Sequence, residues 1–265
     1  MSMDNNEYQD DALRALPVIL FLDTSGSMGA PLGTARKIDK LNEAVVVMMK
    51  KFDEMEQLER FIRVTVIAFD DNANIVGEIN EEPRNFLENF KPLTKGGMTF
   101  LGKALDQAKK FLDDPNFTPK RWYKPVAILV SDGEPNGNWE EPFKKFISEG
   151  KSAKSQRFSV AVGADAQKDR AKKVLLDFAG LEKNLLFAND AEDIVKNFEF
   201  LSRTVSERVS QKNPDAFELP NTSAFDFEER PRFESTRRTT SSNSTGRTRS
   251  VKSAPADEEI DPWDN

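Results

Sequence analysis

The chain contains no cysteine and no histidine among its 265 residues. Without cysteine it has no disulfide framework and no thiol nucleophile, and without histidine it has no imidazole base for a serine-hydrolase triad of the usual kind. Both absences together also exclude a thiolate or imidazole zinc site. Any metal ion that the protein binds is therefore expected to be held by oxygen ligands.

Basic charge and long apolar runs are also scarce. The formal net charge is −7, whereas binding to nucleic acid or to an anionic membrane surface requires a basic face. No apolar run approaches the roughly 20 residues that a membrane span needs. The acidic N-terminal sequence has no signal-peptide pattern. We therefore expect a cytoplasmic protein with no nucleic-acid and no membrane partner.

Apolar residues follow two alternating periods along the chain. Short continuous runs, typical of strands buried on both faces, occur at 17–22, 62–69, 125–130 and 158–162, with shorter candidates at 75–79 and 185–187. Apolar side chains recur every three or four residues, as on one face of a helix, at 38–55, 101–112, 143–147, 174–178 and 194–209. This alternation predicts an α/β fold with a Rossmann-like, mostly parallel six-stranded sheet and helices on both faces.

The composition changes after the last predicted helix. Ser, Thr and Arg dominate residues 235–253, and residues 257–265 carry five carboxylates. Such sequence buries too little apolar area to offset the entropy of ordering. The predicted organisation is an N-terminal extension at 1–13, one folded domain at 14–211 and a disordered tail at 212–265.

The most informative stretch follows the first predicted strand. Asp23, Ser25 and Ser27 stand at alternate positions directly after the apolar run 17–22. A buried strand that ends in Asp-x-Ser-x-Ser presents three hard oxygen ligands at its carboxyl end, and hard oxygens suit Mg²⁺ or Mn²⁺. Asp, Ser and Gly are also the residues of an ordinary turn, so this stretch alone leaves both interpretations open.

Two later segments supply further oxygen atoms. Thr99 follows the paired glycines Gly96 and Gly97 and precedes a predicted helix, where a threonine also serves as an N-cap. Asp132 follows the predicted strand at 125–130, where Asp-Gly also forms a plain turn. Ligands of such sheets bind outside the carboxyl ends of the strands, so the three segments together favour one metal site.

Five oxygen-bearing positions, in this order and context, resemble the metal-ion-dependent adhesion site of von Willebrand factor A domains: Asp23, Ser25, Ser27, Thr99 and Asp132. The resemblance implies that the two serines and the threonine hold Mg²⁺ or Mn²⁺ directly. It implies that the two aspartates act directly or through water.

The same resemblance covers nearly the whole predicted domain, roughly residues 14–210. It implies one antiparallel strand at the edge of the sheet, for which residues 75–79 are the candidate. A cation with few charged ligands keeps residual positive charge and an open position, which a carboxylate from outside can fill. We therefore expect a non-catalytic site that binds a protein partner through an acidic ligand.

Longer segments, which include the metal motif and extend beyond it, also form a pattern: Leu16-Pro17-Val18, the run 23–28, Leu93-Thr94-x-Gly96-Gly97-x-Thr99, Tyr123-Lys124-Pro125, the run 131–135 and Trp139. They are similar to a bacterial subgroup, the TerY-like von Willebrand A proteins of tellurite-resistance and stress gene clusters. This resemblance implies a cytoplasmic scaffold that acts with a Ser/Thr protein kinase and a PP2C-type phosphatase.

The tail carries two candidate signals. Hydroxyls lie beside arginines, as basophilic kinases prefer, at four candidate phosphorylation sites: Thr239, Thr240, Thr248 and Ser250. The alternative is a solvated linker. The acidic end, with Ile260 and Trp263 as apolar anchors, is a candidate docking peptide, and a solubilising end is its alternative.

Three other functions share parts of this pattern. A Mg²⁺-dependent phosphoryl-transfer enzyme is disfavoured because the sequence has no second acidic cluster and no Walker loop with a lysine. The von Willebrand A subunit of a chelatase or AAA+ motor has the same site, but such subunits usually act with large ATPase partners. Cell-surface adhesion would require a signal peptide or an anchor, and neither is visible.

Overall fold

The computed structural model describes residues 14–218, and residues 1–13 and 219–265 lie outside that part. A six-stranded sheet has the strand order β5-β4-β1-β6-β7-β8. Its strands are β1 (Leu16–Asp23), β4 (Ile62–Phe69), β5 (Ala73–Glu81), β6 (Val126–Ser131), β7 (Gln156–Val162) and β8 (Leu185–Ala188). Neighbouring strands are parallel except at the edge, where β5 pairs antiparallel to β4. The predicted sheet and its antiparallel edge strand are confirmed.

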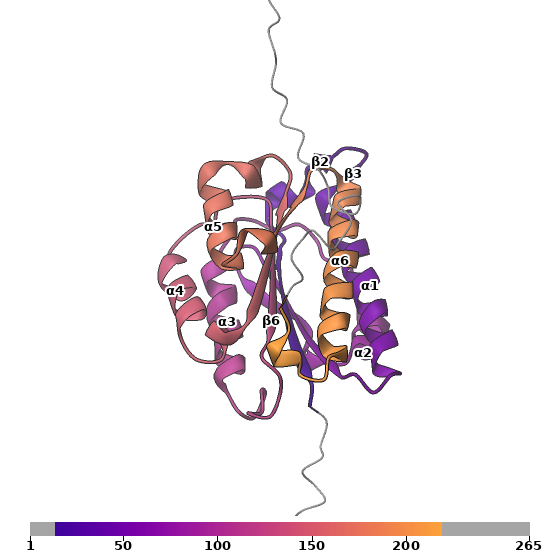
Figure 1. The fold of residues 1–265 in the computed structure, drawn as a ribbon. Coiled ribbons are helices and arrows are strands. Elements are labelled where there is room, and N and C mark those ends of the chain that lie inside the picture. Colours follow the sequence, from indigo (N-terminus) through magenta and orange to yellow (C-terminus); the bar gives the residue numbers. More distant parts are fainter. Residues whose placement is uncertain (1–13, 219–265) are drawn as a thin grey trace, which may run out of the picture. The chain divides into compact units, whose positions relative to one another are not determined.

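Helices cover both faces of this sheet (Figure 1). One face packs against α1 (Lys37–Glu56), α2 (Pro83–Asn89) and α6 (Ala191–Ser210), and the other against α3 (Leu101–Asp113), α4 (Glu140–Ser148) and α5 (Asp169–Ala179). Alternate side chains of β1 belong to different cores: Leu20 packs with the α1 side and Phe21 with the α3 side. Two buried faces explain why this strand is an unbroken apolar run.

The helices lie where the sequence pattern predicts them, with one addition. The seven-residue α2 is too short to show a helical period, and only Pro83 and Phe86 of it are buried. The hairpin of β2 (Pro31–Leu32) and β3 (Ala35–Arg36) also leaves no signal, because each strand has two residues. Within residues 14–218, no helix combines the length and apolar character required to cross a membrane.

The chain stays packed against the domain for several residues beyond the boundary expected at 211. A 3-10 turn, η5 (Pro214–Ala216), follows α6, and Pro214 is buried. The Asp215 carboxylate accepts the N–H of Lys124 at 2.7 Å, and Phe217 packs on the core. These contacts join residues far apart in the sequence, so local composition did not predict them.

Candidate metal-binding site

The loop that leaves β1 is fixed by the residues between its candidate ligands. Thr24 Oγ1 donates a hydrogen bond to the carbonyl oxygen of Phe69, at the end of β4, at 3.2 Å. The next intervening residue, Gly26, donates its N–H to the oxygen of Gly97 at 2.8 Å. Met28, in the 3-10 turn η1 (Gly26–Gly29), is fully buried in the core. Contacts with β4, with the Gly97 loop and with the apolar core therefore fix this loop.

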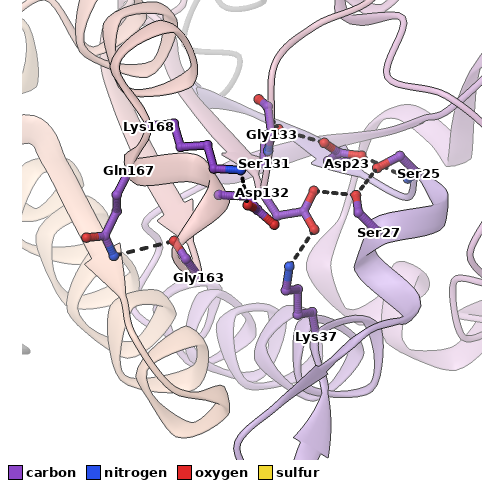
Figure 2. A network of polar contacts seen from close by, with 11 residues as sticks. Asp23, Ser25, Ser27, Lys37, Ser131, Asp132, Gly133, Gly163, Gln167 and Lys168 are labelled. Atoms are coloured by element: carbon purple, nitrogen blue, oxygen red, sulfur yellow. Dashed lines mark hydrogen bonds and ion pairs between the residues drawn. The ribbon is translucent and has the colours of Figure 1, made fainter. Parts of the chain in front are cut away.

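The candidate carboxylates and hydroxyls form one hydrogen-bonded network (Figure 2). Asp23 Oδ1 accepts the N–H of Ser25 at 2.8 Å, and Asp23 Oδ2 accepts the hydroxyl of Ser131 at 2.6 Å. Ser27 Oγ donates to Asp132 Oδ1 at 2.7 Å and lies 3.0 Å from Ser25 Oγ. The first bond is the turn contact expected of an Asp-x-Ser sequence, and the contact between the two serines lies within the same loop, but the bonds from Ser131 to Asp23 and from Ser27 to Asp132 join the end of β1 to the end of β6. The structure therefore brings four of the five predicted residues together.

Thr99 is held at the same edge of the sheet through its backbone. Its N–H donates to Asn136 Oδ1 at 2.9 Å, and its carbonyl accepts the N–H of Asn136 at 2.7 Å. The N-cap of α3 is Phe100, so Thr99 does not cap that helix. Within residues 14–218 the Thr99 hydroxyl has no hydrogen-bond partner, which leaves its oxygen free to bind a cation.

The paired glycines of the Thr99 loop allow two carboxylates to approach its backbone. A Cβ atom on Gly96 would collide with the carboxylate of Asp70, and one on Gly97 with that of Asp71. Both aspartates directly follow β4, so a third strand contributes acidic groups to this sheet edge. Two adjacent aspartates directly after a predicted strand are the sequence signal for this contribution.

A buried lysine is the least expected member of the site. Lys37, the first residue of α1, donates from Nζ to Asp132 Oδ2 at 2.7 Å. The two side chains are 7% and 0% exposed. Nothing in the local sequence distinguishes this lysine from a solvated charge at a helix start. With Asp23 also buried, two carboxylates face one ammonium, which leaves one net negative charge.

The carboxyl group of Asp23 is destabilised as an anion in this environment. Burial raises its pKa to about 6, and the charge of Asp132 acts in the same direction, while hydrogen bonds from Ser131 and Ser25 oppose the rise. A cation bound beside a carboxylate favours its charged form. The site is therefore one in which a bound cation would relieve an unfavourable charge.

The available donors fit a hard divalent cation. Among residues 14–218, no three His, Cys, Asp or Glu side chains gather in a group able to hold a metal ion. The hydroxyls of Ser25, Ser27 and Thr99 are thus the candidate direct ligands. Each oxygen of Asp23 and Asp132 already accepts a hydrogen bond. These carboxylates would therefore support the hydroxyl ligands instead of binding the cation directly. Oxygen-only ligands suit Mg²⁺ or Mn²⁺.

The candidate sites of the tail lie outside the described residues: Thr239, Thr240, Thr248, Ser250, Ile260 and Trp263. The structure neither places them nor tests their predicted roles.

The fold and the site define an open α/β domain with an oxygen-only candidate cation site at the carboxyl edge of its sheet. Residues 18–134 match the family model of the von Willebrand factor type A domain. That segment contains all five candidate site residues. The match and the fold together support a von Willebrand factor A domain in this chain.

Solved structures with low sequence identity share the fold. A von Willebrand factor type A protein from Catenulispora acidiphila is 17% identical over 72% of this chain and 42% of its own, with a TM-score of 0.55. The proximal thread matrix protein 1 of the mussel byssus, described with a zinc-occupied adhesion-site motif, is 19% identical over 74% and 46%, with a TM-score of 0.53. The domain from a type V pili tip protein of Porphyromonas gingivalis is 11% identical over 76% and 98%, with a TM-score of 0.57.

This chain spans less than half the length of the Catenulispora and mussel chains. A search of curated proteins found no match. At these identities the likeness concerns the fold, and the zinc belongs to the mussel protein.

Proposed function

We propose that this domain is a non-catalytic protein-binding module that captures an acidic side chain of its partner through a bound Mg²⁺ or Mn²⁺. One observation carries the proposal. The hydroxyls of Ser25 and Ser27 lie 3.0 Å apart, and the two aspartates behind them are already hydrogen-bonded to the protein. This arrangement would hold a cation with neutral ligands and leave its charge largely uncompensated.

The charge of the site supports an anionic ligand from outside. Among the three buried groups Asp23, Asp132 and Lys37, a divalent cation would change the net charge from −1 to +1. When bound, the cation supplies a Lewis-acidic centre with an open position, for which a carboxylate is the complementary ligand. Ser27 is exposed to solvent, and Met98, beside Thr99, is 52% exposed. A partner therefore has access to the site and to an apolar contact at its rim.

The surroundings of the site support binding over catalysis. The sequence has no histidine or cysteine for acid–base or nucleophilic chemistry. Two-metal phosphoryl transfer needs a second set of acidic ligands. Asp70 and Asp71 lie at the same sheet edge, but within residues 14–218 no three His, Cys, Asp or Glu side chains gather in a group able to hold a metal ion. The structural relatives include matrix and pilus proteins, which is consistent with an adhesive role.

Affinity purification of the tagged full-length chain in Mg²⁺ and in EDTA tests the proposal. Proteins retained in Mg²⁺ should be released by EDTA and should not bind to Asp23→Ala or Thr99→Ala. Thr99→Ser, which keeps the hydroxyl, is the matched control and should retain them. If the same proteins bind the wild type in EDTA and both alanine variants, the cation has no role in binding and the proposal is wrong.

The finer proposal places this module in a bacterial stress system of the tellurite-resistance type. The similarity of the segments 93–99 and 123–139 to TerY-like proteins supports it. The partners are then a Ser/Thr kinase and a PP2C-type phosphatase in the cytoplasm. Mass spectrometry of the retained proteins discriminates, since recovery of a large AAA+ ATPase would instead indicate a chelatase-type subunit.

The tail extends the same proposal. Its Arg-flanked hydroxyls are proposed kinase substrates, and Ile260 and Trp263 are proposed anchors of a docking peptide. Phosphosite mapping of the purified chain tests the first role. Deletion of residues 257–265 tests the second, because every partner complex should survive it if these residues only solubilise the chain.

A further inference from the structure

Lys37 is a cation enclosed within the candidate metal site. Its Nζ lies 2.7 Å from Asp132 Oδ2, and the two side chains are 7% and 0% exposed. Figure 2 shows the ammonium pointing to the carboxylate oxygen that Ser27 does not use. Gly163, directly after β7, lies beside this side chain: a Cβ there would come into van der Waals contact with Lys37 Cε, at 3.4 Å.

A lysine at this position is costly except for its contact with Asp132. Lys37 is the first residue of α1, where the positive end of the helix dipole disfavours a cation. Burial of an ammonium group is also unfavourable unless the group is paired. Asp165, another carboxylate on which the charge of Lys37 acts, is exposed and pairs with Lys168 at 2.7 Å. The ion pair with Asp132 is therefore the interaction that offsets both costs.

We propose that Lys37 is an internal competitor of the divalent cation. Its positive charge neutralises Asp132 and occupies one oxygen of that carboxylate, so Asp132 acts through Ser27 instead of binding the cation directly. Like charges repel strongly in a buried environment, where the effective dielectric constant is well below that of water. Lys37 thus lowers the affinity of the empty site for Mg²⁺ or Mn²⁺. This inference rests on the proposed cation-dependent function.

Because Lys37 weakens cation binding, binding of the cation becomes coupled to binding of the partner. A carboxylate from outside would offset the positive charge that Lys37 and the cation share, so each ligand should increase the affinity for the other by the same factor. The module would then be loaded with its cation mainly when it holds its partner.

Mn²⁺ binding to the full-length chain, measured by calorimetry at fixed ionic strength, tests the proposal. Lys37→Met should bind Mn²⁺ at least tenfold more tightly than the wild type. Lys40→Met is the matched control, because Lys40 lies on the same helix but pairs with Glu43 and Glu192. It removes an equal charge and should change the affinity by less than twofold.

Thermal unfolding supplies a second readout. In EDTA, Lys37→Met should melt below the wild type because Asp132 has lost its partner, and Mn²⁺ should raise its melting temperature more than that of the wild type. If Lys37→Met does not fold even with Mn²⁺, Lys37→Gln, a neutral hydrogen-bond donor, replaces it with the same expected gain in affinity.

The outcomes separate this inference from the proposed function. If the wild type binds Mn²⁺ and neither Lys37 variant binds it more tightly, the proposed role of Lys37 is wrong, but the proposed cation-dependent function is not affected. A comparable gain in Lys40→Met also overturns it, because the effect is then one of overall charge. If neither the wild type nor the variants bind Mn²⁺, the cation-dependent function itself is wrong.

Discussion

Asp23 and Thr99 illustrate two ways in which single residues contribute oxygen atoms to the site. Both oxygens of Asp23 accept hydrogen bonds from the protein, so this carboxylate orients the loop. Thr99 is fixed by its backbone contacts to Asn136, while its hydroxyl stays free of protein partners within residues 14–218. Removal of one side chain therefore affects folding and cation binding to different degrees.

Thr99→Val should separate these effects, because it removes the hydroxyl but keeps the shape of the side chain. No protein hydrogen bond is lost, so the free energy of unfolding in EDTA should stay within about 1 kcal/mol of the wild type. Mn²⁺ affinity should fall at least about tenfold, a loss of about 1.4 kcal/mol. Calorimetry and urea denaturation measure the two quantities, and Thr99→Ser should resemble the wild type in both. Equal Mn²⁺ affinities of the valine and serine variants would exclude Thr99 as a ligand.

The pKa of Asp23 predicts a pH dependence of the cation-free protein. Burial raises this pKa from 3.8 to about 6, so between these values the folded state binds the proton more tightly than the unfolded state. The contribution of this group to stability is present at low pH and is lost as pH rises through about 6. From about pH 4 to pH 7, the wild type in EDTA should lose about 1–3 kcal/mol relative to Asp23→Asn. Parallel stability profiles in urea denaturation would contradict this assignment.

The last helix shows how an element is positioned by one buried side chain. Arg208, two residues before the end of α6, donates to the backbone oxygens of Pro214 at 3.0 Å and Lys124 at 2.5 Å. It also donates to Gln156 Oε1 at 3.0 Å. Burial lowers its pKa to about 10, so it remains charged at neutral pH. These bonds join α6 to the starts of β6 and β7, at the end of the sheet opposite the metal site.

Arg208→Met should destabilise the domain by about 2–4 kcal/mol, because it removes a buried guanidinium and its hydrogen bonds to the oxygens of Pro214, Lys124 and Gln156. Lys196→Met, on the same helix, is the control. Lys196 is 57% exposed in a 3.4 Å pair with Asp193, so its loss should change stability by about 0.5 kcal/mol or less. Urea denaturation followed by circular dichroism measures both. Similar effects of the two substitutions would mean that Arg208 does not anchor the helix.

Across the whole domain, the folding core and the candidate site occupy different regions. Two apolar clusters, one on each face of the sheet, contain the buried side chains of all six major helices. The site lies at the carboxyl ends of β1 and β6, above these clusters. The stability of the fold is therefore expected to come mainly from apolar burial, and cation binding should add a smaller amount to the free energy of unfolding.

Removal of the cation should leave the domain folded. A ligand at 100 times its dissociation constant stabilises a protein by about 2.7 kcal/mol, which corresponds to a shift of roughly 5–11 °C in melting temperature for a domain of this size. EDTA should lower the melting temperature by up to this amount without changing the far-ultraviolet circular dichroism at 25 °C. Loss of the spectrum on EDTA addition would instead identify a structural metal.

The strands of the six-stranded sheet, five of the six helices and the five oxygen-bearing positions could be predicted from the sequence alone. Unbroken apolar runs specify strands buried on both faces, and recurring apolar positions specify helices, because both signals are local and periodic. Asp23, Ser25 and Ser27 are three neighbours on one loop, so their spacing is visible without a structure.

The surroundings of those oxygen atoms depend on contacts between residues far apart in the sequence. Lys37 and Asp132 are 95 positions apart, and Thr99 meets Asn136 across 37. No local pattern links such residues, because their contacts arise when separate strands end at one edge of the sheet. Solvent exposure of a lysine is the usual expectation from sequence, and the burial of Lys37 beside Asp132 follows from the fold, which brings the start of α1 to the loop after β6.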